Sequence, residues 1–416
     1  MTNAFTWIFL CALGISFALR LWLKLRQIRH VLSHRAALPP EFSERISLAS
    51  HQKAADYTIE RSRFALLDII VDTALLLAFT LGGGIQYLHQ LLATEFSGIT
   101  YGVALILAIL GISALLDLPL SLYRQFVIEA RHGFNRMTLG LFFSDLIKQM
   151  LVGLIIGVPV IAAVLWLMGA MGRFWWLHVW LFWCSFNLLI LFVYPTWIAP
   201  LFNKFSPLSD GEMKQRIEAL LERCGFRSSG LFVMDGSRRS SHGNAYFTGF
   251  GNNKRIVFFD TLLEKLAPAE IEAVLAHELG HFRKRHVVKR IALMFISSLL
   301  FLALLGQLIE QNWFYTGLGV SATNTAIALI LFFLALPVFT LPLTPLSSYL
   351  SRQHEFEADA YAAEHTQAAD LVRALVKLYD DNAATLTPDP LHSLFYDSHP
   401  PAAQRIAHLH AIEVTP

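Results

Sequence analysis

Seven stretches of apolar residues constrain what this chain can fold into, because each is long enough to cross a lipid bilayer. About 20 apolar residues in a helix span the hydrocarbon core, where every backbone hydrogen bond must be made within the segment. Hydrophobic residues make up 55% of the 416 residues and charged residues only 15%, which excludes an ordinary soluble enzyme. The sequence therefore predicts an α-helical integral membrane protein with seven transmembrane helices, near residues 4–23, 64–86, 101–121, 151–170, 174–198, 291–309 and 325–346.

The lysine and arginine residues predict which side of the membrane each connection faces. The connections 87–100 and 310–324 contain no basic residue, and 171–173 contains only Arg173. The connection 24–63, in contrast, contains eight. Because cytoplasmic connections retain Lys and Arg, we expect the N-terminus outside the cell and the C-terminus in the cytoplasm. An odd number of spans also requires the two ends to lie on opposite sides.

Two longer polar segments follow the fifth and the seventh spans and face the same compartment, so they can meet in space. The chain is expected to divide into spans one to five with their connections (1–198), a first polar region (199–290), spans six and seven (291–346) and a C-terminal region (347–416). Any chemistry that needs residues from both polar regions is therefore possible on this side of the membrane.

The first polar region has the pattern of a small α+β unit. Gly243–Phe250 and Lys254–Asp260 alternate polar and apolar residues on either side of Gly251-Asn252-Asn253, which indicates a β-hairpin. A helix is expected to begin near Pro268, because proline and acidic residues such as Glu270 favour a first helical turn.

The pattern His277-Glu278-Leu279-Gly280-His281 lies on this helix and is typical of zinc hydrolases. Histidines four residues apart share a helical face, so both imidazoles can bind one ion, and Glu278 beside them can reach a metal-bound water. The three cysteines are too scattered for a thiolate site, so a metal must be held by histidines and carboxylates. The alternative is a pair of solvated histidines beside a basic stretch.

A catalytic zinc normally has three protein ligands, so a third is expected from elsewhere in the chain. The segment directly after span seven holds Glu355 and Asp359, which are i,i+4 neighbours on a helix. One of them could bind the metal while the other accepts the ring N–H of a ligating histidine. Glu357 points away from both. On spacing alone, His354 and His286 are further candidate ligands, and an ordinary charged helix face is an equal alternative.

The combination of these segments resembles the type I CAAX prenyl endopeptidases, the seven-span zinc proteases of prenylated proteins, and their bacterial relatives. The resemblance extends from the first helix to about residue 410. It rests on five segments that occur in the family's order: Phe126–Asn135, Asn244–Phe250, His277–His281, Ser351–Asp359, and Ser398–Pro401 with Arg405.

The resemblance implies a role for each residue of the metal site. His277, His281 and Glu355 would bind one zinc ion per chain. Glu278 would be the general base, and Asp359 would hold a ligating histidine from behind. The family fold would be seven helices enclosing a water-filled chamber, with a gluzincin-like α+β region on the cytoplasmic side.

The same resemblance implies contacts to a substrate. His399 and Arg405 would lie beside the metal and help to hold the scissile carbonyl as it becomes an oxyanion. Asn244 and Ala245 would lie on an edge strand, to which an extended peptide adds as a further strand.

The expected function is that of a membrane-embedded zinc endopeptidase whose family activity removes the C-terminal tripeptide from prenylated CAAX peptides. Its partners would be the lipid bilayer and a peptide or protein substrate, prenylated or not. One alternative is a quality-control protease for unprenylated membrane proteins, which would share every site residue. Another is a non-enzymatic seven-span transporter or receptor with a vestigial zinc site. No nucleic-acid partner is expected, since the basic run before span six is explained as a membrane anchor.

Two further expectations concern the membrane. Asp68, Asp72 and Asp117 lie within predicted spans, where charges are costly, so we expect them to line the wet chamber. Hydrogen bonds between helices, or a position nearer the interface, are the alternatives. The compact loops and the absence of a dilysine retrieval signal at 413–416 favour a bacterial plasma membrane over an endoplasmic reticulum.

Overall fold

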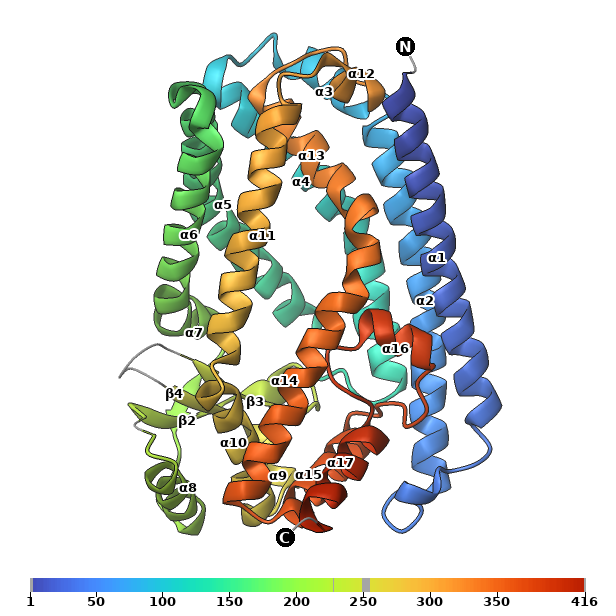
Figure 1. The fold of residues 1–416 in the computed structure, drawn as a ribbon, viewed down its shortest axis with the longest axis vertical. Coiled ribbons are helices and arrows are strands. Elements are labelled where there is room, and N and C mark those ends of the chain that lie inside the picture. The colour runs from blue at the N-terminus through green and yellow to red at the C-terminus, as the bar shows by residue number, and fades with distance from the viewer. Residues whose placement is uncertain (1–2, 227, 249–254, 415–416) are drawn as a thin grey trace.

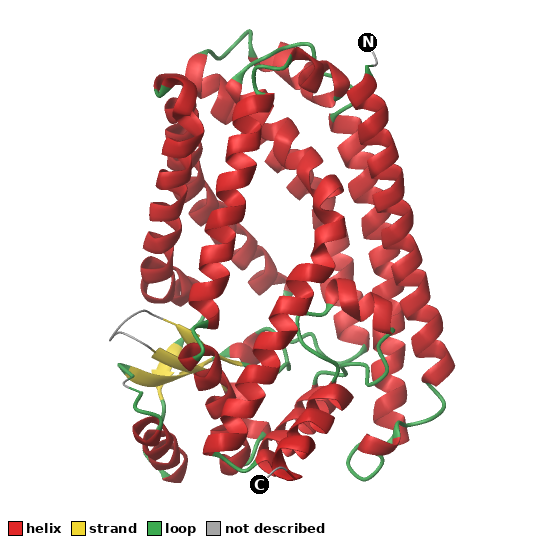
Figure 2. Cartoon of the chain, viewed as in Figure 1, coloured by secondary structure: helices red, strands yellow, loops and turns green. Residues whose placement is uncertain are grey.

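The computed structural model describes residues 3–226, 228–248 and 255–414. Long helices run side by side along the longest axis of the molecule, and the two ends of the chain lie at opposite ends of this axis (Figure 1). The sheet and the helices that pack on it lie together at the C-terminal end (Figure 2).

The long helices and their short extensions are arranged in chain order as follows. They are α1 (Ala4–His34), α2 (Leu48–Phe79), α3 (Gly84–Leu92), α4 (Gly98–Tyr123), α5 (Leu139–Ala170), α6 (Trp175–Val193), α7 (Ala199–Phe202), α11 (His286–Leu308), α12 (Asn312–Gly317), α13 (Thr325–Thr340) and α14 (Thr344–His365). The remaining elements are β1 (Phe205–Pro207), α8 (Glu212–Arg223), β2 (Gly230–Met234), β3 (Ala245–Thr248), β4 (Arg255–Phe259), α9 (Asp260–Lys265), α10 (Pro268–Arg283), α15 (Ala368–Asp381), α16 (Pro390–Tyr396) and α17 (Ala402–Val414).

The starts of several long helices are set by side-chain caps. Asn3 accepts a hydrogen bond from the backbone of Thr6, whose hydroxyl accepts one from the Asn3 backbone. Ser47, Thr138 and Asn324 accept hydrogen bonds from the first turns of α2, α5 and α13. These oxygens satisfy backbone N–H groups that a helix start leaves without an intrahelical partner.

The prediction of seven spans agrees with the structure, but the second span differs from its predicted bounds. Among the described residues, six helical segments are long and apolar enough to cross a membrane, and the bent pair of α2 and α3 makes up to seven. The predicted segment 64–86 is not one helix: α2 begins at Leu48, and α3 continues at an angle of 51° after a break. The break contains Gly83, whose φ of 81° lies in the left-handed region that favours glycine.

The sheet has four strands in the order β1-β2-β4-β3, so β3 lies at an edge. β3 pairs antiparallel with β4, which confirms the predicted hairpin. Its expected turn, residues 251–253, lies outside the described residues. β2 pairs with β4 in parallel, and β1 with β2 antiparallel.

The predicted helix that carries the histidines is α10, which begins at Pro268 as expected. It packs against α8, α14 and α15. Ile271 and Leu275 of α10 are buried in one core together with Phe258 of β4 and Ile217 of α8. This core holds α10 rigidly beneath the sheet, so that its other face is presented to α14.

Candidate metal centre

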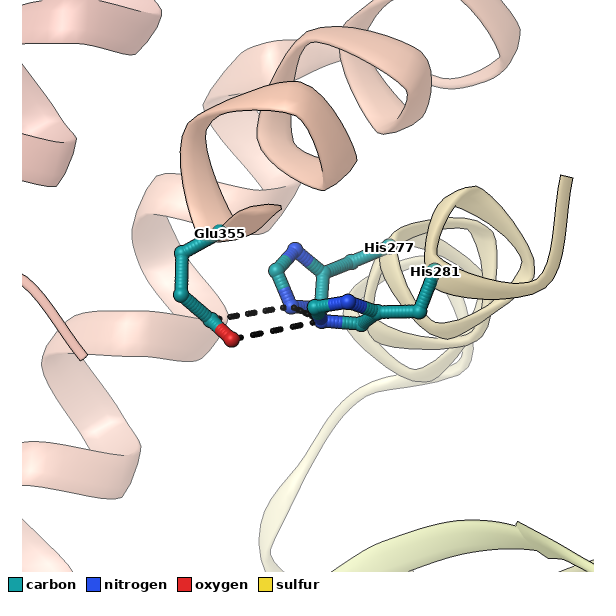
Figure 3. Close-up of side chains that lie close together, drawn as sticks. All are labelled: His277, His281 and Glu355. Atoms are coloured by element: carbon teal, nitrogen blue, oxygen red, sulfur yellow. Dashed lines mark hydrogen bonds and ion pairs between the residues drawn. The ribbon is translucent and has the colours of Figure 1, made fainter. Parts of the chain in front are cut away.

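The side chains of His277, His281 and Glu355 converge between α10 and α14 (Figure 3). Nε2 of His277 lies 3.2 Å from Nε2 of His281. Each of these two nitrogens lies 3.4 Å from a carboxylate oxygen of Glu355. The separations suit a tetrahedral zinc site, in which bonds of about 2.0–2.1 Å place neighbouring ligand atoms roughly 3.4 Å apart.

The environment of Glu355 supports a metal at this point. Its side chain is almost completely buried, and its Oε2 has no hydrogen-bond donor among the residues that the structure describes. A buried carboxylate oxygen without a donor is costly unless a cation meets it. Two imidazoles and one carboxylate are also a donor set that zinc prefers, so the three residues fit this ion.

His277 is held from behind by Asp359 and Arg405. Its Nδ1 lies 2.8 Å from Oδ1 of Asp359, which leaves Nε2 to face Glu355. Arg405 of α17 donates two hydrogen bonds to Asp359, of 2.9 and 2.5 Å. Asp359 and Arg405 are both buried. Asp359 therefore lies behind a candidate ligand.

His281 is held from behind in a similar way, by residues for which no such role was predicted. Its Nδ1 lies 2.9 Å from Nδ1 of His286, and Nε2 of His286 lies 3.0 Å from Glu357. Since Glu357 can only accept, His286 donates from Nε2 and accepts at Nδ1, so His281 donates and keeps its own Nε2 free for a metal. His286, which spacing also allowed as a metal ligand, instead fixes the ring of His281. Glu357 fixes His286 in turn, so it does not simply point into solvent.

This supporting contact depends on a turn that sequence spacing does not reveal. α10 ends at Arg283, and Arg285 adopts a left-handed backbone with φ of 57° before α11 begins at His286. The change of direction brings His286 back beside His281. His354 also stacks on His286, with ring centroids 4.0 Å apart, so it lies behind the site and not among the converging atoms.

The pKa values of the two histidines move in opposite directions. Burial disfavours a charged imidazole at His277, but the neighbouring carboxylates of Asp359 and Glu355 outweigh it and raise the pKa of His277 to about 9. Burial and the charge on His277 lower the pKa of His281 to about 3. The pair therefore carries one positive charge at neutral pH, and a metal ion must displace the extra proton on His277.

Glu278 is half-buried beside the converging ligands. Burial raises the pKa of Glu278, and the nearby charge of Glu355 raises it further. A carboxylate whose pKa moves toward neutrality is better suited to accept and return a proton than an ordinary surface glutamate.

His399 and Arg405 lie on opposite sides of Glu355 and differ in exposure. Nε2 of His399 lies 3.5 Å from Oε1 of Glu355, and its side chain is 60% exposed. Nη1 of Arg405 lies 3.9 Å from Oε2, but its side chain is only 7% exposed. His399 is thus free to touch a substrate, whereas Arg405 is largely committed to Asp359.

Asn244 and Ala245 lie at the start of the edge strand. The amide of Phe259 donates to the carbonyl oxygen of Asn244, so Asn244 makes the hydrogen-bonded pair with β4. Ala245, one residue on, then directs its N–H and C=O away from β4. Its N–H is met by Oδ1 of Asn244 at 2.8 Å. The main chain of Ala245 therefore faces the open edge of the sheet.

The segment Phe126–Asn135 supports the loop that leads into β3. Tyr57 of α2 donates to Glu129 at 2.7 Å, and His242 lies 3.9 Å from the same carboxylate. Asn135 forms an isolated antiparallel bridge with Ser240. The segment Phe126–Asn135 thus links the membrane helices to the loop that precedes the edge strand β3.

The three aspartates within the spans have polar partners. Asp68 lies 3.0 Å from Arg124, and Asp72 lies 3.4 Å from Arg20. Both ion pairs join different helices, which is the alternative that the sequence left open. Asp117 accepts a hydrogen bond from Ser121 of its own helix.

Comparison with known proteins extends over nearly the whole chain. Residues 27–204 match a family described as the CAAX prenyl protease N-terminal region with five membrane helices, and residues 207–413 match peptidase family M48. A CAAX prenyl protease 1 homolog of Arabidopsis thaliana is 35% identical over 94% of each chain. The Homo sapiens homolog is 33% identical over 96% of this chain and 94% of that protein.

A solved structure, that of S. mikatae Ste24p, has the same fold. Its TM-score is 0.93 at 32% identity, and the match covers 98% of this chain and 100% of the other. This likeness and the spans confirm the predicted fold class of seven transmembrane helices enclosing a chamber, with a small α+β region. The chain belongs to the type I CAAX prenyl endopeptidases of peptidase family M48, a family of membrane proteases.

Proposed function

We propose that this membrane protease is a zinc endopeptidase whose metal is bound by His277, His281 and Glu355. The observation that carries the proposal is the convergence of these three side chains from α10 and α14, with Glu278 beside them. The supports behind both histidines add to it, because metal-binding histidines are usually fixed through their second ring nitrogen.

The chain's own residues supply the proton transfers. A bound zinc ion would polarise the scissile carbonyl and make a water molecule more acidic. Glu278 removes a proton from the attacking water and then returns it to the leaving amine. His399 donates a hydrogen bond to the carbonyl oxygen as negative charge develops there, and the positive charge of Arg405 helps to hold it.

Substrate binding follows from the edge strand. An extended peptide adds to β3 through the main chain of Ala245, with Asn244 at the same end, which fixes the scissile bond without requiring particular side chains. We infer that the substrates include prenylated CAAX peptides, from which the C-terminal tripeptide is removed. Support comes from the relatives, which are named CAAX prenyl proteases.

We also infer the orientation in the membrane. The C-terminal end of the molecule, which carries the sheet and the metal centre, faces the cytoplasm, and the N-terminus lies outside. The distribution of basic residues supports this. A bacterial plasma membrane stays our prediction for the host membrane.

The decisive experiment compares Glu278→Gln with the unchanged protein. Purified in detergent and loaded with zinc, the variant should keep one metal per chain by elemental analysis and lose cleavage of a farnesylated CAAX peptide by about 100-fold or more. Glu264→Gln, on an exposed position of α9, is the matched control and should keep both properties. Loss of the metal in Glu278→Gln would contradict the assigned role, and so would full peptidase activity of this variant.

A second substrate separates the two protease alternatives. An unprenylated membrane peptide of the same sequence should be cleaved more slowly than the farnesylated one. Faster cleavage of the unprenylated peptide would instead favour a quality-control protease.

A further inference from the structure

A cavity of about 550 Å³ lies next to His399, between the N-terminal helices α1 and α2 and the C-terminal region. His399 lines this cavity and also lies 3.5 Å from Glu355. The cavity therefore lies beside the metal centre, with the His399 side chain between the two. Its volume falls within the range of about 300–1,000 Å³ that is usual for sites of small ligands.

Two basic side chains in this cavity are in direct contact with neutral groups. Lys24 of α1 donates to Nε2 of His392 at 2.9 Å, and its ammonium lies 4.5 Å from the ring centre of Tyr396. Arg61 of α2 lies over the ring of Tyr57. Among the residues that the structure describes, no carboxylate oxygen lies within 4.0 Å of the charged nitrogens of Lys24 or Arg61.

The charge balance of the cavity favours an anion. Asp397 is the acidic side chain in its lining, against the two cations Lys24 and Arg61. The lining also contains hydrogen-bonding groups such as Gln27 and Thr58. Asp397 acts on Lys24 without forming a close ion pair, so the lining keeps an excess of positive charge. Cations in a partly enclosed site attract a carboxylate more strongly than cations on an open surface.

The position of the cavity relative to the edge strand indicates which end of a peptide would reach it. His242, just before β3, lies 3.0 Å from Asn382, which lines the cavity. The cavity thus lies beyond the first residue of β3, Ala245. A peptide that adds antiparallel to β3 has its C-terminus at this end, whereas a parallel peptide would bring its N-terminal ammonium there.

An antiparallel direction of the added peptide and the positive charge of the cavity both favour a substrate whose C-terminus lies in the cavity. An ammonium group would be repelled by Lys24 and Arg61, and an α-carboxylate would be attracted by them. We propose that Lys24 and Arg61 bind the free C-terminal carboxylate of the substrate. This inference rests on the proposed endopeptidase function and assigns the residues that hold the end of its substrate.

The test uses two fluorescence-quenched peptides of one sequence, each with its scissile bond three residues from the end. One peptide ends in a carboxylate and the other in an amide. The zinc-loaded protein should cleave the carboxylate peptide with a kcat/KM about 10- to 100-fold higher, as expected for hydrogen bonds to a charged group. Equal cleavage of the two peptides would overturn the proposal.

The variants Lys24→Gln and Arg61→Gln assign this preference to the cavity. Each should lower kcat/KM for the carboxylate peptide about tenfold, mainly through KM, and leave the amide peptide within about twofold. Lys24→Arg keeps the charge and should restore the preference. Arg63→Gln, an exposed position of the same helix α2, is the matched control. Equal losses for both peptides would show a structural role and overturn the assignment.

Two further outcomes separate this inference from the proposed function. If the amide peptide is cleaved as fast as the carboxylate peptide and Glu278→Gln abolishes both reactions, the role of Glu278 at the metal centre is supported and the carboxylate site is refuted. If the zinc-loaded protein cleaves neither peptide, both proposals are refuted.

Inhibition by the released tripeptide measures binding of a ligand that is not itself cleaved. The tripeptide acid should inhibit at about tenfold lower concentration than its amide, and Arg61→Gln should remove this difference.

Discussion

The two histidines of the metal centre are each fixed through the ring nitrogen that faces away from it. Asp359 holds His277, and the pair His286 and Glu357 holds His281. The first support was predictable, because Asp359 follows Glu355 by one helical turn. The second was not, since it depends on the left-handed turn that returns the chain after α10.

Removal of the second support should weaken metal binding without unfolding the protein. We expect His286→Ala to raise the dissociation constant for zinc by about 10- to 100-fold, because the ring of His281 is then free to rotate. Competition with a chelating dye measures this constant. His178→Ala, on α6 and away from the metal centre, serves as the control. An unchanged zinc affinity in His286→Ala would refute the supporting role.

The proton on His277 makes zinc binding depend on pH. Its pKa of about 9 means that the imidazole is charged below this pH, and zinc needs the neutral form. The apparent affinity should therefore weaken by about tenfold for each unit that the pH falls between about 8 and 6. Asp359→Asn removes the charge that raises this pKa, so its zinc affinity should change less over the same interval. A flat profile in the unchanged protein would contradict this prediction.

At the scale of elements, the centre depends on how closely α10 and α14 approach each other. Gly280 lies between the two histidines in the sequence and faces Ala358 of α14. A Cβ atom at Gly280 would lie 2.9 Å from the Cα and 3.1 Å from the carbonyl oxygen of Ala358. Both are backbone atoms, so a side chain could be accommodated only by moving α14 and with it Glu355.

Gly280→Ala should therefore separate the two halves of the metal centre. We expect a loss of stability of about 1–3 kcal/mol and a weaker zinc affinity, measured by thermal unfolding and by metal competition. Gly153→Ala on α5 is a matched control, since a Cβ there meets nothing within 4 Å. Unchanged zinc affinity in Gly280→Ala would show that the close approach is not required.

Hydropathy predicts the elements well where the membrane sets their length and poorly where it does not. The window near 64–86 missed the first half of α2, because residues 48–63 contain many charges. This part is nevertheless helical: Ser47 caps it, and Ala55 and Ile59 pack against Val31 of α1. The break before α3 was also missed, because apolar residues continue on both sides of the glycines.

At the scale of the whole molecule, the sequence placed both polar regions on one side of the membrane but could not show how they meet. Spacing left the third ligand open among Glu355, Asp359, His354 and His286. The structure brings Glu355 to the two histidines because α14 continues directly from α13 into the polar region and crosses α10. That crossing is set by packing between distant segments, for which a single sequence carries no periodic signal.

The orientation can be tested by thiol labelling in intact cells. With the natural cysteines replaced by alanine, Glu95→Cys in an exposed connection should react with a membrane-impermeant maleimide. Glu212→Cys at the opposite end of the molecule should react only after lysis. The positive-inside distribution is the reason for this expectation. The reverse pattern would place the metal centre outside the cell.

The contact between Arg405 and Asp359 has a consequence for the order of events during biosynthesis. Both histidines and Glu355 leave the ribosome before α17, so they can be assembled while Asp359 still lacks its cation. Until Arg405 arrives, the buried Asp359 carboxylate faces only the His277 ring, whose charge is shared with Glu355, and this disfavours closure of the region. The centre is thus completed only after the last membrane helix and α17 have been synthesised.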